Sequence, residues 1–461
     1  MKDLQKTIGT LVPVSAIFSS EDQKGDRGTF ASGLIFLDWL KKNHQSAWQI
    51  LPLYQTQLEP GSATKHIPSP YKGYGIGLDP KYLPSAFMND HPTKDEMDKF
   101  TKTHSEWIGD YALFCALRDH FGTDDWREWG KDLMNRDAKA LRKWTDQLKE
   151  ELNDHILMQW RLHKSYNRLR AKAKKLGIAL IGDLPFFITL FSPLVWAHQE
   201  VFQLDKDGHM QYVSGVLNSS TASFGRQLWG HPLYNWDLHR GEVLAFWKIR
   251  LQYLATLFDT VRFDHAKAFF EYGAMDIRND KYDSYKKGPG PEAFKELISF
   301  CKRIGLLVFA EDSGNKIEEL RRFLKIIKVP GIKILRFALK KDDDTINEKY
   351  ANIANYPENC VAYTTTHDTE TLLGYLHELT SEQKQKLATA AGVTYDAGEK
   401  VLAINLRNAV LASPAHMVII PIQDWLLITD RINIPGTELP VNDPNWNFRL
   451  QAPIEELSIK S

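Results

Sequence analysis

Side chains capable of nucleophilic and acid–base chemistry gather in the stretch 261–265, Val-Arg-Phe-Asp-His. Its apolar and polar residues alternate, which predicts a short strand with Arg262, Asp264 and His265 at its C-terminal end. A carboxylate beside an arginine is expected to stay ionised at neutral pH, because the positive charge lowers its pKa. An ionised carboxylate held in position is what a glycosidase-type nucleophile requires. A purely structural pair of Arg262 and Asp264 would give the same pattern.

Three other acids also follow apolar runs that are typical of buried strands. They are Asp183, Glu311 and Asp368, the last directly preceded by His367. Any one of these acids could instead cap a helix or serve a structural role. Parallel barrels, however, bring the carboxyl ends of their strands to one mouth, where active sites are built. Four acids at equivalent positions, with basic side chains beside them, therefore indicate a common site: Asp183, Asp264, Glu311 and Asp368 with Arg262, His265 and His367.

Glycosyl transfer is the chemistry that such a site suits, with one carboxyl group attacking the anomeric carbon and a second exchanging protons. The proton donor must be neutral at working pH, which burial or neighbouring negative charge can achieve. Glu311 lies beside Asp312 and is expected to face further acids, so we expect Glu311 to be the acid/base. Asp264, next to Arg262, is the expected nucleophile. Asp368 could hold sugar hydroxyls and stabilise the oxocarbenium-like transition state.

A mouth rich in carboxylates could instead bind a divalent metal ion. His265 and His367 are the candidate nitrogen ligands for such an ion. The sequence offers no closely spaced ligand motif such as HExxH to accompany them. Metal chemistry is therefore the less favoured interpretation of these residues.

Eight apolar runs have the character of strands, and most are separated by segments of helical periodicity. This alternation predicts a parallel sheet, and eight units predict closure into a (β/α)8 barrel, an α/β fold. We expect one catalytic barrel over 1–461, with an insertion loop at 54–92, an inserted helical subdomain at 93–175 and a substrate-binding insertion at 186–240. The expected strands lie within 9–19, 48–53, 177–185, 261–265, 306–310, 331–337, 361–366 and 417–422.

Composition argues against several classes of function. Lysine plus arginine and aspartate plus glutamate each number 58 among 461 residues, so no net charge favours nucleic acid or an anionic membrane. No apolar run reaches membrane-spanning length, and no signal-peptide pattern opens the sequence. The cysteines at 115, 301 and 360 match no metal or redox spacing. We expect a cytoplasmic protein that is a monomer or a homodimer.

Motifs along nearly the whole sequence resemble those of one family, the amylomaltases or 4-α-glucanotransferases of the α-amylase clan. The match is specific, because the motifs also occur in the same order. The resemblance implies transfer of α-1,4-glucan segments between maltooligosaccharides, with retention and without a metal or organic cofactor. The matching motifs are SPY at 69–71, IGDLPFF at 181–187, VWAH at 195–198, GRQLWGHPLYNWD at 225–237, VRFDH at 261–265, FAEDSG at 309–314, PGIKILRFAL at 330–339, YTTTHDTET at 363–371, PIQD at 421–424, IPG at 434–436 and NWNFR at 445–449.

Individual roles also follow from this resemblance. It implies that Asp264 is the nucleophile, Glu311 the general acid/base and Asp368 the residue that stabilises the transition state. The remaining matched positions are expected to bind substrate, and they are Tyr71, Asp183, Arg262, His265, His367, Gln227 and Trp229.

The sequence also departs from the family pattern on the side expected to receive the acceptor. Lys267 stands where the family has an arginine, so a planar bidentate contact would be lost. Arg226 replaces a glycine, and residues 216–224 replace a loop that shapes the acceptor side. These departures leave open an α-glucoside hydrolase or a transferase with altered acceptor specificity. A non-catalytic sugar-binding protein is a further alternative, which the three intact carboxylates disfavour.

Overall fold

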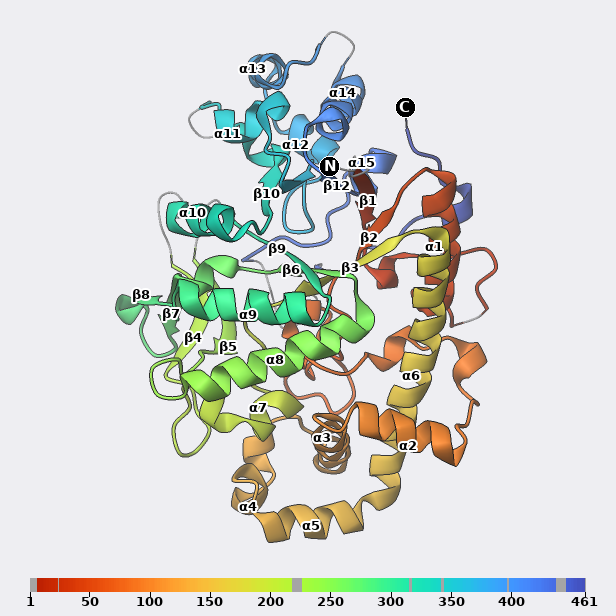
Figure 1. Ribbon diagram of the computed structural model, residues 1–461, viewed down its shortest axis with the longest axis vertical. Coiled ribbons are helices and arrows are strands. Elements are labelled where there is room, and N and C mark those ends of the chain that lie inside the picture. The colour runs from red at the N-terminus through yellow and green to blue at the C-terminus, as the bar shows by residue number, and fades with distance from the viewer. Residues whose placement is uncertain are drawn as a thin grey trace.

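The computed structural model describes residues 6–23, 25–217, 226–314, 317–340, 344–395, 398–436 and 445–460. At its centre, eight strands form a parallel sheet in which neighbours are successive along the chain and the last strand pairs with the first (Figure 1). The two ends of this sheet are the fifth and sixth strands, which are also successive along the chain. This arrangement confirms the predicted (β/α)8 barrel. The strands are β1 (Thr7–Leu11), β2 (Ala47–Gln49), β3 (Ala179–Leu184), β6 (Thr260–Phe263), β9 (Leu307–Ala310), β10 (Gly331–Ile334), β11 (Cys360–Tyr363) and β12 (Met417–Pro421).

Helices cover the outside of the barrel, and polar side chains and glycines set their ends. Thr29 and Thr371 each accept a backbone N–H in the first turn of the helix that follows. Within the described residues, no helix is both long and apolar enough to span a bilayer. The helices outside the segment 93–177 are α1 (Phe30–Lys42), α7 (Pro193–Ala197), α8 (Arg240–Leu257), α9 (Pro291–Arg303), α10 (Glu318–Ile327), α11 (Glu348–Ala351), α12 (Leu372–His377), α13 (Ser381–Ala391), α14 (Glu399–Ala412) and α15 (Ile422–Leu426).

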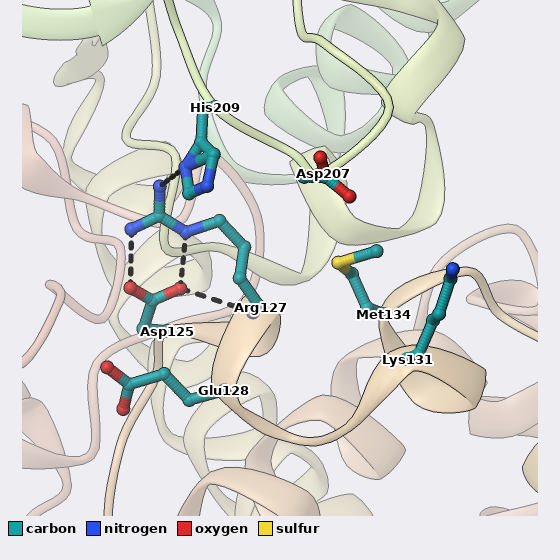
Figure 2. A pocket seen from close by; sticks show the side chains of 7 residues that line it. All are labelled: Asp125, Arg127, Glu128, Lys131, Met134, Asp207 and His209. Atoms are coloured by element: carbon teal, nitrogen blue, oxygen red, sulfur yellow. Dashed lines mark hydrogen bonds and ion pairs between the residues drawn. The ribbon is translucent and has the colours of Figure 1, made fainter.

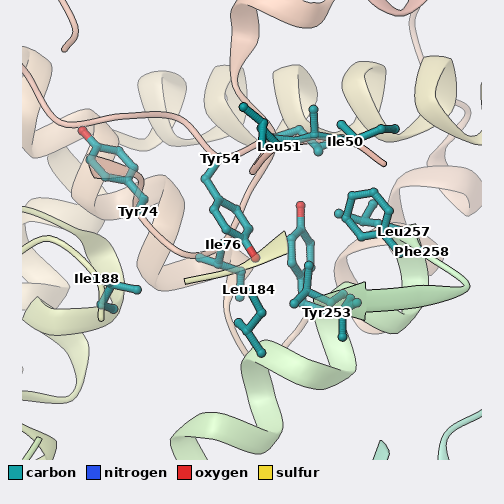
Figure 3. Packing of buried hydrophobic residues seen from close by; sticks show 14 of the residues in the cluster. Ile50, Leu51, Tyr54, Tyr74, Ile76, Leu184, Ile188, Tyr253, Leu257 and Phe258 are labelled. Atoms are coloured by element: carbon teal, nitrogen blue, oxygen red, sulfur yellow. The ribbon is translucent and has the colours of Figure 1, made fainter. Parts of the chain in front are cut away.

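Five further helices lie between β2 and β3, at the end of the molecule away from α13 and α14 (Figure 1). The last of them returns the chain to the barrel and ends at Gly177, whose φ of 72° suits glycine. Tyr54, Leu184 and Tyr253 belong to the continuous apolar core, and Figure 3 shows their packing. The division into a barrel with insertions remains a prediction. These helices are α2 (Lys94–Thr103), α3 (Ile108–Phe121), α4 (Lys131–Met134), α5 (Ala138–Gln147) and α6 (Lys149–Leu176).

A second sheet, which the sequence patterns did not predict, lies beside the barrel. It is antiparallel, with the strand order β5-β4-β7-β8. Its strands are short, and β4 and β7 contain glycines that lower strand propensity, so they gave no clear alternating pattern. Most of the altered loop at 216–224 lies outside the described residues. The strands are β4 (Tyr212–Val216), β5 (Gln227–Pro232), β7 (Glu271–Asp276) and β8 (Ser284–Lys287).

Asp312 helps to close the barrel between β9 and β10. Its Oδ1 accepts the backbone N–H of Ile332 at 2.7 Å, and its Oδ2 accepts from Nε of Arg321 at 2.9 Å. Beside it, the N–H of Ala310 donates to the carbonyl of Pro330 at 2.9 Å. A Cβ atom at Gly331 would lie 2.8 Å from the Asp312 carboxyl group, so only glycine fits there. Asp312 therefore binds β10 and α10, rather than serving as one of the acids around Glu311.

Replacing Asp312 by alanine should destabilise the protein. The change leaves Arg321 without its buried partner and the N–H of Ile332 without an acceptor, which together cost about 3 kcal/mol. Denaturant unfolding followed by circular dichroism measures the loss. The exposed Asp98 on α2, changed to alanine, is the control and should shift stability by less than about 0.5 kcal/mol. Equal effects of the two variants would contradict this role for Asp312.

Candidate active site

The four acids predicted to share a site do so, at the carboxyl ends of the barrel strands. Asp183 lies on β3, Asp264 directly follows β6, Glu311 follows β9, and Asp368 follows β11 by five residues. Asp183, Asp264 and Glu311 all contact the guanidinium of Arg262, the third residue of β6. Strand ends that are far apart in sequence are thereby brought to one mouth of the barrel.

The guanidinium of Arg262 is buried, with only 6% of the residue exposed. Its Nη1 lies 2.7 Å from Oδ2 of Asp183 and 2.9 Å from Oδ1 of Asp264. Its Nη2 lies 2.6 Å from Oε2 of Glu311. Charge-assisted contacts of this length are strong, and they offset the cost of removing the guanidinium from water. One cation therefore holds three of the four acids together.

Hydrogen bonds favour the ionised form of Glu311. Its Oε2 accepts from Arg262 and from the backbone N–H of His265 at 3.0 Å, and its Oε1 accepts from the Ser313 hydroxyl at 2.6 Å. Burial raises the pKa of Glu311, but Arg262, Ser313 and the His265 N–H outweigh burial and leave the pKa below its usual value. His265 reaches this position through a left-handed backbone, with φ of 46°.

Asp264 has the opposite tendency. Burial raises its pKa well above the usual value, and although Arg262 opposes this shift, three nearby carboxylates reinforce it. The sequence predicts an ionised Asp264 and a neutral Glu311, whereas in the structure the pKa of Asp264 is raised and that of Glu311 is lowered. The difference arises because Arg262 is not the partner of Asp264 alone. Glu311 shares that charge and has two further donors.

Asp368 is held ionised by its neighbour His367 and by Asn433 from a distant part of the chain. His367 Nε2 lies 3.1 Å from its Oδ2, and Nδ2 of Asn433 donates to its Oδ1 at 2.7 Å. Burial raises the pKa of Asp368, but His367, Asn433 and Arg262 outweigh burial and lower the pKa to about 2. Asn433 was not predicted to belong to the site. The neighbouring motif at 434–436 marks the segment, but no pattern singles out the asparagine.

Tyr71 connects two of the predicted residues across the mouth. Its hydroxyl donates to Oδ2 of Asp183 at 2.6 Å and lies 2.8 Å from Nε2 of His367. Its ring stacks on that histidine, with 5.5 Å between the ring centroids and 10° between the planes. Trp446, another residue that was not predicted, lies with its ring centroid 5.4 Å from that of Tyr71. These contacts place Tyr71 beside the carboxylates, as its predicted role requires.

The predicted residues on β5 lie at the edge of this cluster. The Trp229 ring meets His265 edge-on, with 4.8 Å between centroids. Gln227 is linked to the cluster through Trp229, whose Nε1 donates to its Oε1 at 2.9 Å. Lys72, next to Tyr71, donates to the carbonyl of Trp229. This hydrogen bond connects the antiparallel sheet to the loop that carries Tyr71, beside the site.

Lys267 and Arg226, which depart from the family pattern, each form an ion pair with an acid of the antiparallel sheet region. Nζ of Lys267 lies 3.4 Å from Oε1 of Glu271 and 4.9 Å from the centre of the Tyr285 ring. Nε of Arg226 lies 2.8 Å from Oδ2 of Asp283, in the turn before β8. Both side chains therefore bind elements of the antiparallel sheet.

Outside this site, a groove opens between the α4 region and the turn at 205–209 (Figure 2). Arg127 crosses it, paired with Asp125 and 3.0 Å from Nδ1 of His209. The groove contains none of the predicted site residues. Across the part of the chain that the structure describes, no three histidine, cysteine, aspartate or glutamate side chains are grouped as metal ligands.

Known proteins are similar to this chain in both sequence and fold. A family model described as 4-alpha-glucanotransferase matches residues 76–455. The 4-alpha-glucanotransferases of Aquifex aeolicus (strain VF5) and Thermus thermophilus are each 31% identical, covering 90% of this chain and 90% and 89% of their own. The structure of the amylomaltase from Streptococcus agalactiae in complex with acarbose matches with a TM-score of 0.84 at 26% identity, over 97% of this chain and 95% of that one. The chain therefore belongs to the 4-alpha-glucanotransferase family.

Proposed function

We propose that the protein transfers α-1,4-glucan segments between maltooligosaccharides by double displacement through a covalent intermediate on Asp264. The observation that carries this proposal is the contact of Asp264 and Glu311 with one guanidinium. Both carboxyl groups lie within reach of one guanidinium, which is compatible with the separation of about 5 Å that retaining enzymes need. Inverting enzymes need a wider gap to admit water. The acarbose complex of the Streptococcus agalactiae relative supports an oligosaccharide substrate.

In the first step, a carboxylate oxygen of Asp264 attacks the anomeric carbon while Glu311 protonates the departing glycosidic oxygen. In the second step, Glu311 removes a proton from the hydroxyl of the acceptor sugar, and that oxygen displaces Asp264. The acceptor segment thus takes the place of water, and the configuration at the anomeric carbon is retained. Asp368, ionised because His367 and Asn433 bind it, stabilises the positive charge of the transition state.

The pKa of Glu311 is lowered and that of Asp264 is raised, whereas the proposed reaction needs a protonated Glu311 and an ionised Asp264. Arg262 contacts both carboxyl groups. In the proposed cycle, the donor sugar moves the guanidinium toward Asp264, which lowers the pKa of Asp264 and raises that of Glu311.

The surrounding residues supply the sugar contacts in this proposal. Tyr71, Asp183 and His367 hold the donor sugar next to the scissile bond, where their polar atoms converge. Three residues at the edge of the cluster contact the sugar on the other side of that bond, and they are Gln227, Trp229 and His265.

The product profile from maltotriose tests the proposed reaction. Transfer should yield a ladder of longer oligomers together with glucose or maltose, separated by chromatography. D264N, E311Q and D368N should each lower the rate by about a hundredfold or more, because each removes a group that acts in the transition state. The matched control is D259N, an exposed acid just before the same strand as Asp264 at the other end of the barrel, and it should retain the wild-type rate.

Shortened products without longer oligomers would show that water is the acceptor and that the protein is a hydrolase. Full activity of D264N would contradict the covalent mechanism. An unchanged maltotriose solution, with maltose and other acceptors also unchanged, would contradict glucanotransfer altogether.

Y71F should weaken catalysis while the fold is kept. The change removes the hydroxyl that donates to Oδ2 of Asp183. The other oxygen, Oδ1, has no hydrogen-bond partner among the described residues. The stacking of the ring on His367 is retained. Loss of a hydrogen bond to a charged group predicts a fall in kcat/KM for maltotriose of about tenfold to a hundredfold. Y282F, at an exposed tyrosine, is the control. An unaltered kcat/KM for Y71F would exclude Tyr71 from the donor site.

A further inference from the structure

Ser313 contacts the expected proton donor but has no role in the reaction as described so far. It lies two residues after Glu311, in the loop between β9 and α10, and it is partly buried. Its hydroxyl donates to Oε1 of Glu311 at 2.6 Å. A hydroxyl donor to a carboxylate oxygen at this distance makes a strong charge-assisted hydrogen bond.

The two oxygens of Glu311 have different partners. Oε2 accepts from Arg262 at 2.6 Å and from the N–H of His265 at 3.0 Å, so that oxygen is committed to fixed donors. Oε1 accepts from Ser313. A proton that Glu311 carries for catalysis therefore belongs on Oε1, the oxygen that Ser313 contacts. The serine hydroxyl competes directly with that proton.

We propose that Ser313 is a positioning residue, which sets the upper pH limit of the reaction by donating its hydroxyl to the proton-carrying oxygen of Glu311. The proposal rests on the acid/base role proposed above for Glu311. By stabilising the ionised carboxylate, Ser313 makes Glu311 a stronger acid, which favours proton delivery to the leaving oxygen. The same contact causes Glu311 to lose its proton at a lower pH. Ser313 thus balances acid strength against the pH range of activity.

Apart from Asp264, the other titratable groups around Glu311 do not explain an alkaline limit of activity, because their charges do not change in that pH range. Arg262 stays positively charged, and burial raises the pKa of Tyr363 above its usual value. Burial lowers the pKa of His265 to about 4, so that histidine is neutral throughout the alkaline range. Asp264 and Glu311 both contact Arg262, so their titrations are coupled and the alkaline limb belongs to the pair. Among the described residues, the titratable or charged groups that interact with Glu311 include Arg262, Asp264, His265 and Tyr363.

The test is the pH profile of kcat at saturating maltotriose in S313A and S313T, because kcat reports the pKa of the acid in the complex with substrate. A general acid must be protonated, so activity falls as pH rises through its pKa. Removing a donor to the ionised form raises that pKa, and S313A should move the alkaline limb upward by about one pH unit. S313T keeps the hydroxyl and should retain the wild-type limb. S299A, on the exposed face of α9, is the matched control and should also leave the profile unchanged.

An alkaline limb of S313A that coincides with the wild-type limb would overturn the proposal, as would equal shifts in S313A and S313T. If S313A does not fold, S313C replaces it, and its weaker donor should give a smaller upward shift. E311Q separates this inference from the proposed function. An active E311Q would contradict the acid/base role itself, whereas an inactive E311Q with an unmoved S313A profile would contradict only the role of Ser313.

Discussion

One buried positive charge, the guanidinium of Arg262, is the feature on which the rest of the site depends. A charge inside a protein is costly unless it is paired, so the guanidinium must be surrounded by carboxylates. Asp183, Asp264 and Glu311 fulfil that need, and they come from neighbouring positions in the barrel sheet, at β3, β6 and β9. The contacts that make the buried charge tolerable also hold Asp264 and Glu311 against the same guanidinium.

The barrel and the membership of the acidic cluster were predictable from the sequence, because both follow from local patterns. Buried parallel strands appear as short apolar runs, and the residue types at their ends are visible directly. Asp264, Glu311 and Asp368 each follow such a run, so barrel closure alone brings them to one mouth. The closing contact of Asp312 with Ile332 could not be predicted, since adjacency to Glu311 suggested a different role.

The parts that could not be predicted depend on contacts between distant segments. Asn433 and Trp446 reach the site from beyond the last strand, and no local pattern indicates that path. The antiparallel sheet joins segments up to about seventy residues apart. Its strands β4 and β7 approach so closely that a Cβ atom at Gly273 would lie 2.3 Å from the Gly215 carbonyl oxygen. The ionisation of Asp264 and Glu311 is likewise a property of the assembled group, because both share Arg262.

The charged groups at the centre of the site depend on one another, whereas those at its edge form separate ion pairs. At the centre, changing one acid alters the environment of every other group, because the carboxylates share a single buried cation. At the edge, Arg226 pairs with Asp283 while a third of its side chain remains exposed, and a pair of that kind contributes little to stability. Residues there can differ from the family pattern at small cost. The central charges therefore constrain one another, whereas the residues at the edge can vary independently.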